Sequence, residues 1–135
     1  MIPHPFLRCA LLLDALASGA MGLLLLLAGR WLHPWLGLPE PLMVWGGLAL
    51  LPYALLLIFL ARRPAVRRAA IHAVIGANLV WVGDSVVLLL SGWVTPTLLG
   101  EGFVLAQAAA VAVFAGLQTV GLRRSLAARR ALVSA

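Results

Sequence analysis

The stretch that decides the fold is residues 60–68, which read Leu60-Ala61-Arg62-Arg63-Pro64-Ala65-Val66-Arg67-Arg68. Four arginines and a proline stand here between two long apolar runs. An apolar run of ~20 residues is long enough to cross a bilayer as a helix. The stretch is therefore predicted to be a charged loop at one membrane face, between two spanning helices.

Apolar runs of that length occur four times in the 135 residues. Hydrophobic residues make up 64% of the chain and charged residues only 10%, whereas soluble domains carry ~25% charged residues. A water-soluble fold with so few charges would not cover its own surface. The sequence predicts an all-α, four-helix membrane bundle that forms a single transmembrane domain over residues 1–135. The expected spans are about 8–28, 42–60, 70–90 and 96–122.

The arginines indicate how such a bundle would be oriented. With four spans, nine of the ten basic residues fall on one side and only Arg30 on the other. Positively charged loops remain in the cytoplasm, and short connections make neighbouring helices antiparallel. We therefore expect an up-down bundle with both termini in the cytoplasm, in the inner membrane of a bacterial cell. The aromatic residues Trp31, Trp35, Trp45 and Trp93 mark the opposite interface.

The basic clusters are also the expected contacts to the lipid bilayer. Each arginine near an anionic surface contributes about 1 kcal/mol of attraction. The segments are too short to indicate nucleic-acid binding. The candidate contacts to anionic lipids at the cytoplasmic face are Arg62, Arg63, Arg67, Arg68, Arg123 and Arg124.

Two further patterns concern the outer turns. Glu40-Pro41 and Thr95-Pro96 are expected to open the second and fourth helices, because proline suits the first helical turn. Residues 25–37 and 88–100 also align with one deletion, each as a leucine run followed by Gly, Trp and Pro. This predicts two hairpins related as a 2+2 repeat, although leucine-rich segments also align by chance.

Two acids lie inside spans and define the candidate intramembrane polar site. An ionisable group in hydrocarbon normally faces the bundle interior and has a partner. Counting ~1.5 Å per residue places the polar residues in two layers. One layer is expected to hold Asp14, Asn78 and Gln118, and the other Asp84 and Gln107. The site is either a path for protons or a polar substrate, or a set of hydrogen bonds that hold the helices together.

A second group lies on one arc of the third span. Asn78, Trp81 and Ser85 share this arc, and Tyr53, beside Pro52, is expected opposite it. The group either lines a ligand pocket or belongs to the ordinary core.

Several kinds of chemistry have no matching residues. The single cysteine, Cys9, forms neither an internal disulfide nor a Cys-x-x-Cys pair. His4, His33 and His72 are too scattered to ligate a haem or a metal ion. No cofactor is expected, and the chain is predicted not to be an enzyme.

Short motifs spread over most of the chain resemble a family of uncharacterised bacterial four-helix membrane proteins. They are Asp14-Ala15 with Ser18-Gly19, Leu51-Pro52-Tyr53-Ala54, Asn78 with Trp81 and Ser85, Phe103-Val104 with Ala106-Gln107-Ala108, and Leu117-Gln118 with Gly121-Leu122-Arg123-Arg124. The resemblance implies no activity. The small multidrug transporters also have four spans and an acid in the first helix, but their acid is a glutamate in a different context.

The function expected from these features is that of a non-catalytic accessory or scaffolding subunit. With so little of the chain outside the apolar spans, its partners would be other membrane protein subunits, or another copy of itself, met within the bilayer. The alternative is a small proton-coupled transporter that works as a homodimer, with Asp14 or Asp84 as the proton site.

Overall fold

The computed structural model describes residues 1–135 and consists of four helices. They are α1 (Pro5–Leu36), α2 (Glu40–Arg62), α3 (Arg68–Ser91) and α4 (Leu98–Ser134). Each is long and apolar enough to cross a membrane. The fold is therefore compatible with a small multi-pass membrane protein.

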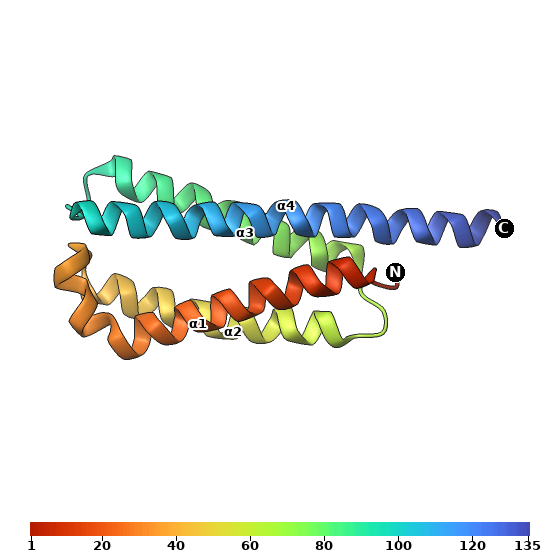
Figure 1. The fold of residues 1–135 in the computed structure, drawn as a ribbon, viewed down its shortest axis with the longest axis horizontal. Helices are drawn as coiled ribbons and strands as arrows, with labels where there is room; N and C mark the ends of the chain where they lie inside the picture. The colour runs from red at the N-terminus through yellow and green to blue at the C-terminus, as the bar shows by residue number, and fades with distance from the viewer.

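The helices are arranged as two hairpins (Figure 1). The α1–α2 and α3–α4 turns lie at one end of the molecule, and the α2–α3 loop and both termini lie at the other. Helix α1 packs against α2 and α4, and α3 packs against α4. No Cα atom of α2 lies within 8 Å of a Cα atom of α3. Side chains, and not close backbone packing, therefore join α2 to α3.

Helices α1 and α4 are longer than the predicted spans. Helix α1 continues through Arg30 and Pro34 and ends at Gly37, whose φ of 66° suits a residue without a side chain. Pro34 lies inside α1 and has no N–H to donate to the Arg30 carbonyl one turn earlier. Helix α4 begins after Thr97, whose hydroxyl accepts from the Gly100 N–H at 3.1 Å. The predicted start at Thr95-Pro96 was therefore two residues early.

The aligned segments of the predicted repeat differ in local structure. Gly29 lies inside α1, whereas its counterpart Gly92 ends α3 with a φ of 76°. Gly37 ends α1, whereas its counterpart Leu99 lies inside α4. The 2+2 repeat stays a prediction from the sequence.

Close helix packing depends on glycine at three crossings. A Cβ atom on Gly47 would lie 2.8 Å from the Gly22 carbonyl oxygen, between α1 and α2. A Cβ atom on Gly121 would lie 2.7 Å from the Cα atom of Leu7, between α1 and α4. Gly100 meets the backbone of Leu36 in the same way. These contacts fix α1 against both of its neighbours.

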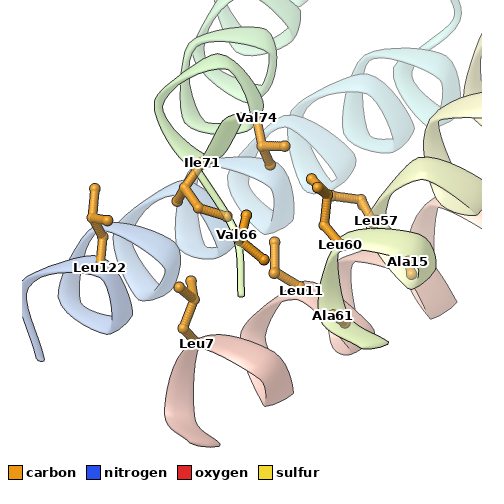
Figure 2. Close-up of a cluster of buried hydrophobic side chains, with 10 residues drawn as sticks. All are labelled: Leu7, Leu11, Ala15, Leu57, Leu60, Ala61, Val66, Ile71, Val74 and Leu122. Carbon is orange, nitrogen blue, oxygen red and sulfur yellow. The ribbon is translucent and has the colours of Figure 1, made fainter. Parts of the chain in front are cut away.

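A cluster of buried apolar side chains fills the end of the molecule that holds the termini (Figure 2). All four helices contribute to it, for example Leu7, Leu57, Ile71 and Leu122. Arg8 lies beside the cluster and donates to the Ala61 carbonyl at 2.6 Å, which satisfies a free acceptor in the last turn of α2. This packed end supports the polar residues of the next layer.

Candidate intramembrane polar site

Asp14 lies at the centre of a buried hydrogen-bond network. Its Oδ2 atom accepts from Asn78 Nδ2 at 2.8 Å and from Gln118 Nε2 at 2.7 Å. Its Oδ1 atom accepts from the Ser18 hydroxyl at 3.0 Å. Tyr53 donates to Asn78 Oδ1 at 2.8 Å. We call these five residues the Asp14 cluster: Asp14, Ser18, Tyr53, Asn78 and Gln118.

The Asp14 cluster draws on every helix of the chain. Asp14 and Ser18 come from α1, Tyr53 from α2, Asn78 from α3 and Gln118 from α4. Asp14 is 1% exposed and Gln118 is 0% exposed. No arginine, lysine or histidine takes part, so neutral donors alone solvate the carboxyl group. The structure thus brings together the first predicted layer, Asp14, Asn78 and Gln118.

Two members of the Asp14 cluster were not assigned to this layer from the sequence. Ser18 follows Asp14 by one helical turn, and that i, i+4 spacing was the available signal. Tyr53 was expected opposite Asn78 but not within reach of an acid. Its hydroxyl lies 3.5 Å from Asp14 Oδ2.

A second network joins α3 to α4. Trp81 Nε1 donates to Gln107 Oε1 at 2.6 Å, and Gln107 Nε2 donates to the Ser85 hydroxyl at 2.9 Å. Ser85 in turn donates to the Trp81 carbonyl at 2.8 Å. We call Trp81, Ser85 and Gln107 the Trp81 cluster. Gln107 therefore bonds to the arc of α3 that was considered for a pocket.

The predicted pairing of Asp84 with Gln107 was wrong. Asp84 is exposed on the outside of the chain and forms no hydrogen bond or ion pair within it. The reason is helical geometry, because successive residues turn by ~100°. Ser85 points into the molecule and is 8% exposed, so Asp84 is turned away from it to the outer face of α3.

A cavity of about 280 Å³ lies between the two clusters. Ser18, Tyr53 and Asn78 of the Asp14 cluster line it, together with Trp81 and Gln107 of the Trp81 cluster. The rest of its wall is apolar and comes from all four helices. The structure thus places Tyr53, Asn78 and Trp81 around one cavity, whereas Ser85 does not line it.

The six arginines considered for lipid contacts are all exposed at the end that holds the termini. Arg63 lies over the Phe59 ring at 5.2 Å and Arg124 over the Phe6 ring at 4.5 Å. Such stacking holds the guanidinium groups near the apolar surface. No group of three or more His, Cys, Asp or Glu side chains is placed to hold a metal ion.

Comparison with known proteins gives no further assignment. No family model matches the chain, and neither a curated protein nor a solved structure matches it. The resemblance noted from the short motifs stays a prediction.

Proposed function

We propose that this chain is a non-catalytic membrane subunit that docks against a different membrane protein through the outer face of α3. The observation that carries the proposal is Asp84, an acid on an exposed helix face inside a candidate span. It lies seven residues from the end of α3 at Ser91, which is ~10 Å along the helix axis. An acid facing lipid at that depth is costly unless it gains a partner.

The surface around Asp84 suits close approach of another helix. Gly76, Val80, Gly83 and Val87 recur at spacings of four, three and four residues, so they lie on one face of α3. A Cβ atom added at Gly76 or Gly83 would meet nothing within 4 Å. These glycines therefore have no packing role within the chain. Small residues of this kind let membrane helices approach closely.

Charge complementarity favours a different chain over a second copy. Two copies that paired through this face would bring their Asp84 side chains together, and like carboxylates repel. No basic side chain of α3 lies near Asp84 to offset them, because Arg68 and His72, the only basic residues of α3, lie three turns or more before it in the helix. The complementary partner is a membrane helix with an arginine or another strong donor at the depth of Asp84.

The proposal can be tested with synthetic membrane helices in liposomes. The probes are leucine-alanine peptides that differ only in one residue, Arg or Leu, placed seven positions from one end. Energy transfer between labelled peptide and labelled full-length protein measures association. We expect the Arg peptide to bind at least tenfold more tightly than the Leu peptide, because only the Arg peptide offers a donor to Asp84.

Matched variants show where the peptide binds. Asp84→Leu removes the acceptor, and Gly83→Leu fills the surface beside it, so both should abolish the preference for the Arg peptide. Gly102→Leu is the control, since a Cβ atom there also meets nothing within 4 Å but lies on α4. Equal binding of both peptides, or saturable self-association through Asp84 without any peptide, contradicts the proposal.

A small proton-coupled carrier is the second candidate, and one observation favours it. The cavity adjoins the Asp14 cluster, so an acid and a solute space lie side by side in the molecule. The same liposomes separate the two functions when a proton gradient is imposed. A subunit moves no protons. A proton flux in the parent protein that is lost in Asp14→Asn supports the carrier and overturns the subunit.

A further inference from the structure

We propose that the cavity between the Asp14 and Trp81 clusters is a binding site for a small bicyclic aromatic molecule that carries one hydroxyl group. The proposal rests on the polarity, volume and wall of the cavity. It is independent of the docking face on α3.

The polarity of the cavity wall is set by Asp14. A carboxylate only accepts hydrogen bonds, so the amide nitrogen of Asn78 turns toward it. The amide oxygen of Asn78 then faces Tyr53 and accepts the phenol proton at 2.8 Å. The Ser18 proton is likewise directed at Asp14. The second amide proton of Asn78 is engaged by Gln118 Oε1 at 3.0 Å, so each donor of this cluster that borders the cavity is already bonded.

At the other end of the cavity, the hydrogen-bond donors are also already engaged. The Trp81 N–H is engaged by Gln107, and both amide protons of Gln107 are engaged by Ser85 and Val104. The polar side chains that line the cavity therefore have only acceptor lone pairs left to offer, on Ser18, Tyr53, Asn78 and Gln107. A ligand that donates one hydrogen bond satisfies such a wall. A ligand that only accepts leaves its own polar group unpaired, which costs affinity.

The volume and lining set the apolar part of the ligand. A cavity of about 150 Å³ lined by apolar side chains binds benzene, and this one measures about 280 Å³. It therefore fits two fused rings. Tyr53, Trp81 and Phe114 in the wall supply aromatic rings, which favour offset or edge-to-face contact with another aromatic group.

Access is from the side of the molecule. Ala49 on α2, Ala77 on α3 and Ala110 on α4 line the cavity and are also exposed. All three lie well inside their helices, and the backbones of α2 and α3 are not in close contact. An apolar solute dissolved in the bilayer core reaches the cavity between these short side chains without crossing the charged ends.

The test is calorimetric titration of the full-length protein in lipid nanodiscs, with empty nanodiscs as the blank for partitioning. The probes are 2-naphthol and its methyl ether, 2-methoxynaphthalene, which have the same rings but differ in the donor. We expect saturable one-site binding of 2-naphthol, with affinity at least tenfold higher than that of the methyl ether. Equal affinities, or heats no larger than the blank, overturn the proposal.

Two matched pairs of variants locate the site. Val111 lines the cavity and Val113 is exposed outside it, so Val111→Phe should abolish 2-naphthol binding and Val113→Phe should preserve it. Ala77→Leu and Ala73→Leu form a second pair on α3, because Ala77 lines the cavity and Ala73 does not. Circular dichroism and thermal unfolding check that each variant folds. Unchanged binding in both folded cavity variants places the ligand elsewhere and contradicts the proposal.

Discussion

At the scale of single residues, Asp14 has the most demanding environment in the chain. It is buried, carries no counter-charge and depends on three neutral donors. Removing a donor from a buried acceptor costs more than the average worth of one hydrogen bond, because the remaining partner loses solvation. Asp14 in turn sets the orientation of the Asn78 amide, and the Asn78 amide oxygen sets that of the Tyr53 hydroxyl. A change at one of them therefore propagates to the cavity wall.

We predict that Gln118→Leu destabilises the protein by about 1–2 kcal/mol, the cost of a lost buried hydrogen bond within a membrane protein. Both the donor to Asp14 and the acceptor for Asn78 disappear. Unfolding of purified protein in detergent with increasing SDS measures the change. Thr119→Val is the control, because the Thr119 hydroxyl only donates to Ala115 in its own helix. Equal stability of the two variants would show that the Asp14 cluster does not hold the helices together.

Contacts between polar side chains could be predicted from the sequence where the depth of each residue along its helix was enough to decide them. Asp14, Asn78 and Gln118 lie at similar depths, and the structure brings them together. Asp84 and Gln107 also lie at similar depths, yet Asp84 faces outward. Depth follows from counting residues, whereas the direction of a side chain depends on how each helix is rotated in the bundle. A nearly uniform apolar sequence does not encode that rotation clearly.

At the scale of elements, glycine positions determine how closely α1 approaches its neighbours. The sequence indicated the apolar core of each helix, but it did not indicate the true ends of α1 and α4. Hydropathy falls near Arg30 and Arg123, although the backbone stays helical to Leu36 and Ser134. A helix ends where its caps lie, at Gly37 for α1, and not where the apolar run stops.

We predict opposite effects for two glycine substitutions in α4. Gly121→Ala places a Cβ atom 2.7 Å from the Leu7 Cα atom, so α1 must shift and stability falls by about 1–3 kcal/mol. Gly116→Ala meets nothing within 4 Å and gains helix propensity, about 0.5–1 kcal/mol. Thermal unfolding in detergent, followed by circular dichroism, compares both with the parent. A Gly121→Ala protein as stable as Gly116→Ala would contradict the close crossing of α1 and α4.

At the scale of the whole molecule, the amino-terminal segment ties together the end that holds both termini. The Val66 N–H donates to the Met1 carbonyl at 2.8 Å, and the His4 N–H donates to Ser125 at 2.8 Å. The amino-terminal segment is thus bonded both to the arginine-rich loop and to α4. That end also holds the larger apolar cluster (Figure 2). The loop and the two terminal regions therefore form one connected unit.

We predict that reporter proteins inserted after Arg68 or fused at Ala135 read cytoplasmic, whereas a reporter near Pro39 reads external. The physical reason is that nine of the ten arginines lie on one side of the four helices. Paired alkaline phosphatase and fluorescent protein fusions measure the two locations. If the reporter at Ala135 read external while the other two results stayed as expected, the chain would have an odd number of spans, which would contradict the four-span model.

The Asp14 cluster is completed late in the synthesis of the chain. Asp14 precedes Asn78 by 64 residues and Gln118 by 104 residues. The first hairpin therefore enters the membrane when Asp14 has only Ser18 and Tyr53 as partners. The amides of Asn78 and Gln118 are synthesised later, with α3 and α4. A chain that stops before α4 lacks the Gln118 amide, so the Asp14 carboxyl group loses one of its hydrogen-bond donors. Helix α4, which is synthesised after the other three, thus completes the solvation of a residue in α1.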